Sequence, residues 1–387
     1  MKRFLLQSHS QPDKFPFCIA DERNKPLIAY QSMANPSLRT LEKKAKQMLW
    51  SLVGACTGKA PNPPNLPLDF TNINKVLVIR PDRLGDVVLS TPVYETLKKS
   101  FPHLNINVLV ESAHVGLLTD NPKISRVLSF DPKQPLAIFR QLRDEHFDLT
   151  LTLNKKFSAT ATFFALCSGA KIRVGYDHPE NAWAHNVRVP VEGPPQHESD
   201  NNLELLRALG IQEIQTQPKL YFNPEETQKV VELLKEFRPS LNQPVVLVKS
   251  GTRIAQWGWR WEKFQAVIEH LLESNQAQVW LVNGPGEEAE LRTAIANMPN
   301  KPKILPLLTA KELALLIQEC DVLLCNHTGI MHLASAVDKP VCVIFKHGEI
   351  KRWGPLNANS IVLEERYDDS LSPDTVLNTL QEMLSTQ

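Results

Sequence analysis

Short apolar runs alternate with helical patterns from Lys75 onward, and this alternation limits the possible folds more than any other feature. In the first series the runs are KVLVIR, INVLVE, RVLSF, FDLTLTL and IRVGY, and helices are expected at 87–100, 113–119, 135–145, 157–168 and 200–210, the last closed by Gly210. One helix joins each run to the next, and such crossovers connect parallel strands. The pattern predicts an α/β domain with a doubly wound parallel sheet.

A second alternating series begins at QPVVLVKSG (243–251). Its further strands are QVWLVNG, ILPLL, DVLLCN and PVCVIF, with helices expected at 261–274, 286–297, 310–318, 330–337 and 373–384. We therefore expect two Rossmann-like domains, split near 215–240. Clefts in such folds lie at the carboxyl ends of the strands, so the site is expected there.

The composition of the chain argues against several classes of function. Of the 387 residues, 22% are charged, and the formal net charge is +1, which argues against a nucleic-acid-binding surface over the whole protein. The six cysteines form no C-x-x-C pair, so a zinc or iron–sulfur site is unsupported. The apolar run in the opening MKRFLLQSHSQPDK is too short for a signal peptide, so we expect a cytoplasmic protein.

Residues 1–74 differ from the rest, because QPDKFPF and GKAPNPPNLPLDF are proline-rich and typical of linkers. Between them, residues 38–56 have apolar side chains at helical spacing and four basic side chains on the other face. Such a helix can pack on its own domain, or it can lie on an anionic membrane surface. Both alternatives stay open at this point.

The stretch RPDRLGDVVLSTP (80–92) places unusual charge directly after the first strand. Asp86 lies where the next helix begins, and an aspartate there is commonly a helix cap. The carboxyl end of a central strand is also where α/β clefts hold their reactive groups, and a carboxylate there can accept a proton from a hydroxyl nucleophile.

The stretch CNHTGIMHLASA (325–336) follows a strand and opens a helix. Free backbone N–H groups at Thr328 and Gly329 would favour a phosphate, with His332 one turn further on; the alternative is a plain N-cap and a buried histidine. KSGTRIAQWGWRWEKF (249–264) leaves a strand through Gly251, and its Arg253 could neutralise a diphosphate. NGPGEE (283–288) is a similar strand-to-helix turn.

Together these motifs resemble glycosyltransferase family 9, the heptosyltransferases. The family's opening motif, R-x-x-x-x-G-D-x-x-x-x-x-P, is matched by Arg80, Gly85, Asp86 and Pro92, and its second, N-D-T-G-x-M-H-L-A-A-A, resembles NHTGIMHLASA. FDLTLTL, HESDNNLELLRALGI, PVVLVKSGTR, VNGPGEE and RWGPLN fall in family order. The resemblance covers roughly residues 75–360.

This resemblance implies a GT-B fold, in which two Rossmann-like domains face each other across a cleft. We expect an N-terminal extension at 1–74, an acceptor domain at 75–225 and a nucleotide-sugar donor domain at 226–387. The implied reaction is an inverting transfer of a heptose from ADP-heptose to a hydroxyl of the lipopolysaccharide inner core, on a lipid A–Kdo acceptor. The resemblance implies no metal or other cofactor. The enzyme would work in the cytoplasm, and on the cytoplasmic face of the inner membrane if residues 38–56 bind lipid.

The resemblance also assigns the site. It places the catalytic base at Asp86, and we expect acceptor contacts from Arg80 and Arg83. The expected donor-binding residues are Gly251, Thr252, Arg253, Glu287, His327, Thr328, Gly329 and His332.

Two departures keep other functions open. His327 stands where the family has Asp, and about Gln256 stands where it has a phosphate-binding Lys. A related nucleotide sugar as donor, a nucleotide-sugar epimerase of the same fold, and a catalytically weak nucleotide-sugar-binding protein therefore remain alternatives.

Overall fold

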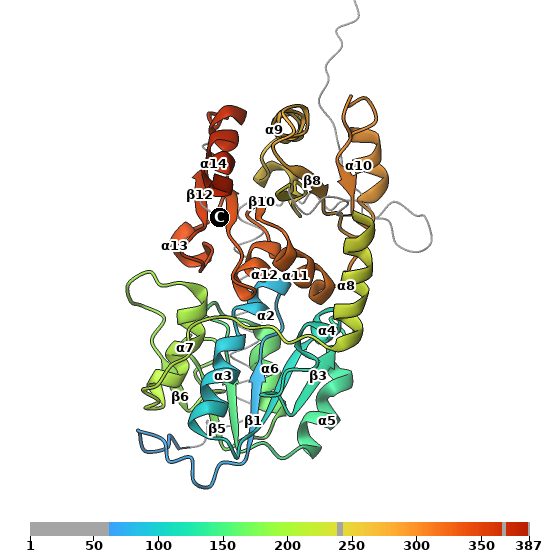
Figure 1. Cartoon of the computed structure of the whole chain (residues 1–387). Helices are drawn as coiled ribbons and strands as arrows, with labels where there is room; N and C mark the ends of the chain where they lie inside the picture. The colour runs from blue at the N-terminus through green and yellow to red at the C-terminus, as the bar shows by residue number, and fades with distance from the viewer. Residues whose placement is uncertain (1–61, 238–242, 366–368, 386–387) are drawn as a thin grey trace, which may run out of the picture. The chain divides into compact units, whose positions relative to one another are not determined.

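The computed structural model describes residues 62–237, 243–365 and 369–385, which form an α/β protein built on two six-stranded parallel sheets (Figure 1). Within these ranges no helix is both long and apolar enough to cross a bilayer. The basic helix expected at 38–56 lies outside the described residues. The two-sheet α/β architecture expected from the alternation is confirmed.

The first sheet has the strand order β3-β2-β1-β4-β5-β6, and every neighbouring pair is parallel. Its strands are β1 (Lys75–Ile79), β2 (Asn105–Glu111), β3 (Arg126–Phe130), β4 (Leu149–Thr152), β5 (Ile172–Tyr176) and β6 (Val187–Val189). The order reverses between β1 and β4, which is the place where ligands bind in folds of this type.

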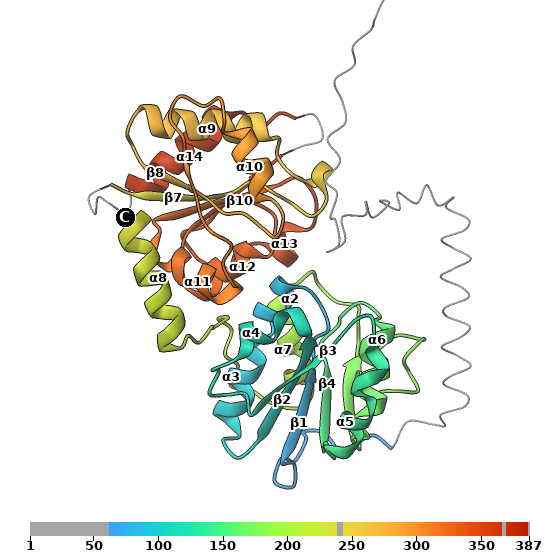
Figure 2. The same ribbon diagram turned by 90° about the vertical axis from the view of Figure 1, so that its right-hand side faces the viewer.

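Helices cover both faces of this sheet because successive residues of β1 point to opposite sides. Val76 and Val78 join one core with α2, α3 and α7, whereas Leu77 and Ile79 join another with α5 and α6. Figure 2 shows these two layers on either side of the strands. The helices are α2 (Leu84–Val88), α3 (Thr91–Ser100), α4 (Val115–Leu118), α5 (Phe139–Asp144), α6 (Ala159–Cys167) and α7 (Glu198–Ala208), with 3₁₀ turns η1 (Ser112–His114) and η2 (Pro135–Ile138).

The second sheet repeats the same plan, with the order β12-β11-β10-β7-β8-β9 and its reversal between β7 and β10. Its strands are β7 (Val245–Lys249), β8 (Gln278–Leu281), β9 (Lys303–Ile304), β10 (Val322–Asn326), β11 (Val341–Phe345) and β12 (Ile361–Glu364). All of its neighbouring pairs are parallel.

The helices of the second sheet form two layers as well. Alternation in β7 directs Val246 and Val248 toward α9, α10 and α14, and Val245 and Leu247 toward α11 and α12 (Figure 2). The helices are α8 (Pro224–Phe237), α9 (Trp261–Glu273), α10 (Glu288–Ala294), α11 (Ala310–Glu319), α12 (Ile330–Ala336), α13 (Ile350–Trp353) and α14 (Pro373–Ser385), with the 3₁₀ turn η3 (Ala255–Trp257).

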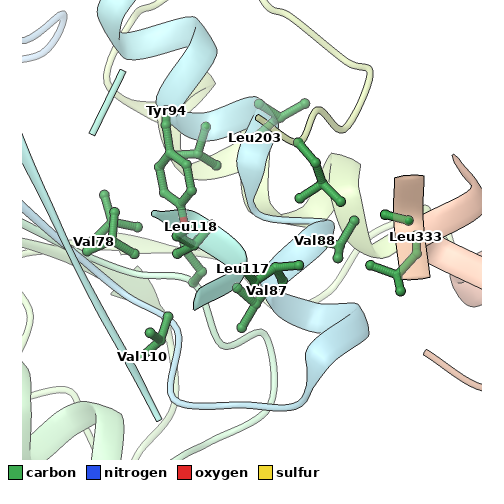
Figure 3. Packing of buried hydrophobic residues seen from close by; sticks show 14 of the residues in the cluster. Val78, Val87, Val88, Tyr94, Val110, Leu117, Leu118, Leu203 and Leu333 are labelled. Atoms are coloured by element: carbon green, nitrogen blue, oxygen red, sulfur yellow. The ribbon is translucent and has the colours of Figure 1, made fainter. Parts of the chain in front are cut away.

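We call β1–β6 with α2–α7 the N-terminal lobe, and β7–β12 with α8–α14 the C-terminal lobe. Their contact is apolar where α2 meets α12, and one core cluster runs across it. Leu333 of α12 lies next to Val88 of α2 in this cluster (Figure 3). Helix α2, which carries Asp86, is therefore held by packing from both lobes.

The helix expected at 87–100 is instead two helices, α2 and α3, which break at Leu89–Ser90. Pro92 explains the break, because it has no N–H to donate to the carbonyl of Val88. The hydroxyl of Thr91 donates to that carbonyl at 2.8 Å instead. The break leaves α2 as a separate short helix at the carboxyl edge of the sheet.

Candidate active site

The predicted site residues lie at the reversal points of the two sheets. In the N-terminal lobe, Arg80, Arg83 and Asp86 follow β1, which pairs with β4. In the C-terminal lobe, Gly251 follows β7 and His327 follows β10, and these strands also pair. Each lobe therefore brings two loops together at the edge where α/β folds bind ligands.

A pocket of ≈ 250 Å³ opens at the end of β1. It is lined mainly by the N-terminal lobe, and Arg352 and Trp353 of α13 complete it from the C-terminal lobe. The lining residues are Arg80, Asp82, Arg83, Asp86, Asn154, Lys155, Lys156, Glu198, Arg352 and Trp353. Five of these ten side chains are cationic, so the pocket suits an anionic ligand.

Arg80 is the buried centre of the pocket wall, with 1% of its surface exposed. Its Nη2 donates to Asp86 Oδ1 at 2.6 Å and to Glu198 Oε1 at 2.9 Å, and its Nη1 donates to the carbonyl of Leu153 at 2.9 Å. Burial alone would lower the pKa of Arg80, but Asp86, Glu198 and Asp82 outweigh burial and raise it. The guanidinium therefore stays charged and holds the carboxylates in place.

Asp86 has the geometry that a base needs. Its side chain is 17% exposed, it lines the pocket, and Oδ1 is fixed by Arg80. Within the described part of the chain, Oδ2 has no hydrogen-bond partner, so this oxygen can accept a proton from a ligand hydroxyl. No side-chain hydrogen bond caps α2 at Arg83, and Asp86 lies inside the helix rather than at its N-cap.

Asp82 is the second carboxylate of this loop. Asn154 donates to its Oδ2 at 2.7 Å, and burial raises the pKa of Asp82 although Arg80 opposes the shift. Asp82 is thus anchored through Oδ2 to the loop after β4, and its Oδ1, like Oδ2 of Asp86, has no hydrogen-bond partner among the described residues.

Glu198, the first residue of α7, joins the two lobes. It is 2% exposed, and its Oε2 accepts from Nε and Nη2 of Arg352 at 2.8 and 2.7 Å. Burial alone would raise the pKa of Glu198, but Arg80 and Arg352 lower it. Beside it, Nε2 of His197 donates to the carbonyl of Gly354 at 3.0 Å.

Further cations surround the pocket mouth. Lys155 donates to Asn201 at 2.9 Å, whereas the exposed Lys156 and Arg83 form no ion pair with the carboxylates that the structure describes. Arg253 of the C-terminal lobe is close enough to Arg83 that, after burial, this second positive charge also lowers the pKa of Arg253. Two arginines from opposite lobes thus face one region, where an anion would relieve their repulsion.

The expected donor residues after β7 and β8 lie close together. Lys249 forms an ion pair with Glu287, whose Oε2 also accepts from the Gly284 N–H at 2.7 Å. A Cβ at Gly251 would lie 2.9 Å from Lys249 Nζ and 3.0 Å from Glu287 Oε1, so a larger residue here would require these two side-chain ends to shift.

Asn326, the last residue of β10, ties this group together, because it donates to the Ser250 carbonyl at 2.6 Å and accepts from the Trp259 N–H at 2.8 Å. Thr252 Oγ1 donates to the carbonyl of Ile254 at 2.7 Å. The loops after β7 and β10 are therefore held as one unit.

His327 and Thr328 follow Asn326 at the start of α12. The His327 ring stacks on Phe345 with centroids 4.1 Å apart, and its Nδ1 donates to the His347 carbonyl at 3.0 Å. Burial lowers the pKa of His327, so the ring is neutral near pH 7 and cannot attract phosphate by charge. The Thr328 hydroxyl is buried and has no partner among the described residues, which leaves it for a ligand.

His332 packs between the lobes rather than at an open surface. A Cβ at Gly85 would lie 2.6 Å from its Cδ2, so glycine at position 85 permits the close approach of α2 and α12. Burial, with smaller contributions from His197 and His327, lowers the pKa of His332 to about 3. A direct donor contact by a charged His332 therefore has no support in this geometry.

Several residues of this arrangement were not predicted from the sequence. Asn154, Lys155 and Lys156 lie in the loop after β4, and the strand order alone would have indicated them. Glu198 and Arg352 lie in two of the segments that fall in family order, but no local pattern shows that they meet, because their contact depends on the packing of the lobes. No cluster of three potential metal-ligating side chains is found among the described residues.

Comparisons with known proteins agree with one another. The model of glycosyltransferase family 9 (heptosyltransferase) matches residues 136–377. The chain is 26% identical over 293 residues to lipopolysaccharide heptosyltransferase 3 of Escherichia coli, covering 72% of this chain and 85% of that protein.

Two solved structures share the fold. The family 9 glycosyltransferase of Veillonella parvula gives a TM-score of 0.75 at 18% identity, over 83% of this chain and 100% of the other. The E. coli heptosyltransferase WaaC with ADP-2-deoxy-2-fluoro heptose gives 0.63 at 17% identity, over 80% and 99%. At these identities the likeness shows the fold alone.

Proposed function

The chain belongs to glycosyltransferase family 9, the heptosyltransferases, and from this premise we propose that it transfers a heptose from ADP-heptose to a hydroxyl of the lipopolysaccharide inner core. The observation that carries the proposal is the Asp86 carboxylate, fixed by Arg80 through one oxygen and open to a cationic pocket through the other. The names of the relatives, which are heptosyltransferases, support heptose as the transferred sugar and lipopolysaccharide as the product.

In the proposed reaction Asp86 removes the proton of the acceptor hydroxyl as that oxygen attacks the anomeric carbon of the donor. The bond from the anomeric carbon to the phosphate oxygen breaks, and its electron pair leaves with ADP. Attack from the face opposite the leaving group inverts the anomeric configuration. Base assistance of this kind contributes typically about 10²–10⁴-fold to the rate.

The donor is proposed to lie on the C-terminal lobe, residues 226–387. Gly251, Thr252 and Thr328 line the loops at the strand reversal, and the orphaned Thr328 hydroxyl supports a phosphate contact there. Arg253 supplies a positive charge for the diphosphate, because it is exposed and faces Arg83 across the lobes. Glu287, Gly329 and His327 are proposed to shape this site, with His327 as a neutral ring.

The acceptor is proposed to enter the pocket on the N-terminal lobe, residues 75–225. Lys155, Lys156 and Arg83 line it, and a lipid A–Kdo acceptor carries carboxylates and phosphates that these cations would bind. Arg80 is proposed to act by holding Asp86, since its guanidinium is buried and already shared among protein partners. Work at the cytoplasmic face of the inner membrane, with contact through residues 38–56, stays a prediction.

A panel of nucleotide sugars tests the proposed substrate pair. The purified chain is mixed with ADP-heptose, ADP-mannose or a UDP-sugar, with and without a lipid A–Kdo acceptor, and ADP or UDP release is followed. We expect rapid ADP release with ADP-heptose only when the acceptor is present. Conversion of the nucleotide sugar without an acceptor would indicate an epimerase, and tight donor binding without release would indicate a binding protein.

A further inference from the structure

We propose that Glu198 is a positioning residue that couples the C-terminal lobe to the catalytic base through the chain Arg352–Glu198–Arg80–Asp86. The inference rests on the proposed role of Asp86. Three contacts carry it: Arg352 to Glu198 Oε2, Glu198 Oε1 to Arg80, and the same Arg80 nitrogen to Asp86 Oδ1.

One nitrogen of Arg80 serves both carboxylates. Nη2 carries two N–H groups and lies 2.6 Å from Asp86 and 2.9 Å from Glu198, so it can donate one to each, and the two anions share the positive charge of one guanidinium. Arg352 reduces the demand of Glu198 on that charge by neutralising Glu198 from the other side. Removing Arg352 would leave Glu198 to draw Arg80 away from Asp86, and removing the charge of Glu198 would give Arg80 to Asp86 alone.

This series of contacts includes the C-terminal lobe only when the two lobes are together. Arg352 belongs to α13, its guanidinium stacks over Trp353 at 5.0 Å, and both residues line the pocket that contains Asp86. Because Glu198 is buried and Arg352 is mostly buried, the ion pair is poorly screened and its partners are fixed. Approach of the C-terminal lobe thereby completes the arrangement that orients the base.

Opposite shifts in the pH dependence of activity distinguish this role from simple packing. Glu198→Gln removes a negative charge near Asp86, so the acid limb of the kcat/KM profile should move to lower pH, by roughly 0.5 to 1 unit. Arg352→Gln removes a positive charge, so the limb should move to higher pH by a similar amount. The other charged groups facing Asp86, which are Arg80, Asp82, Arg83, His114, Lys155 and Lys156, are the same in both variants.

Turnover gives a second readout. Glu198→Gln weakens one of the two carboxylate contacts that hold the Arg80 guanidinium, so Arg80 can shift toward Asp86 and move the base from its position. Because a base that is displaced slightly loses much of its effect, Glu198→Gln should lower kcat by about 10- to 100-fold, while the KM for ADP-heptose stays within about threefold. Glu198→Asp keeps the charge and should recover part of kcat. His197→Asn is the matched control: it removes the neighbouring bond to Gly354 but leaves Arg80 untouched, and asparagine still caps α7. Its kcat should stay within about threefold of the parent.

ADP release with ADP-heptose and a lipid A–Kdo acceptor measures all of these variants. Should Glu198→Gln fail to fold, Arg352→Gln tests the same chain from its more accessible end. An unmoved acid limb in Arg352→Gln, or a kcat near that of the parent in a folded Glu198→Gln, would overturn the inference. Asp86→Asn distinguishes failure of this inference from failure of the proposed function. An inactive Asp86→Asn protein together with a normal kcat in Glu198→Gln would contradict the role of Glu198 alone. An active Asp86→Asn protein would contradict the proposed function as well.

Discussion

Asp86→Asn should lower kcat by about 10²–10⁴-fold while ADP binding stays within about threefold of the parent. The amide keeps the size of the side chain and can still accept from Arg80, but it cannot take a proton from the acceptor hydroxyl. Calorimetric titration with ADP and ADP release with both substrates measure the two quantities separately.

Asp177→Asn is the control for this substitution, because among the described residues the Asp177 carboxylate pairs with Arg188 alone, at the surface, and both side chains are about half exposed. Its kcat should equal that of the parent. An Asp86→Asn protein with near-normal turnover would contradict the assignment of the base. A loss of turnover together with a loss of ADP binding would show that the substitution disturbs the donor site instead.

Arg80→Met should destabilise the fold by about 3–5 kcal/mol, because it removes the counter-charge that three carboxylates share. Asp82 and Asp86 lose the ion-pair partner that the structure gives them, and among the described residues the buried Glu198 keeps only Arg352 as a counter-charge. Chemical denaturation followed by circular dichroism gives the free energy of unfolding. Because Arg80 also orients Asp86, turnover should fall in any fraction of Arg80→Met that remains folded.

Arg188→Met serves as the comparison, since its exposed ion pair with Asp177 contributes about 0–1 kcal/mol. Equal stability losses in Arg80→Met and Arg188→Met would show that the Arg80 network does not hold the lobe together. Arg80→Lys should fall between the two, because a single ammonium cannot reach Asp86, Glu198 and the Leu153 carbonyl at once.

Much of the fold could be predicted from the hydrophobic periodicity of the sequence, because central strands such as β1 and β7 are short, apolar and bounded by clear turns. Two edge strands were missed: β6 has only three residues, and β12 is only partly buried. Helix α8 lies in the stretch assigned to the split between domains, and the expected boundary at 225/226 falls within it.

The site residues likewise divide into those that could be predicted from the sequence and those that could not. Asp86 and Thr328 lie in the segments that follow β1 and β10, so their place at the carboxyl edge could be inferred from position along the chain. The partners of Arg80 could not, because Glu198 lies 118 residues away and reaches it only through the packing of α7. The burial of His332 against Gly85 likewise depends on how α2 and α12 meet, which no local pattern encodes.

The anomeric configuration of the new linkage tests the central proposal most directly. Product made from ADP-heptose and a lipid A–Kdo acceptor is isolated, and the one-bond carbon–proton coupling at the transferred sugar is measured by NMR. A single base at Asp86, with attack opposite the leaving ADP, predicts a configuration opposite to that of the donor. A linkage with the donor's own configuration, or no linkage at all, would contradict it.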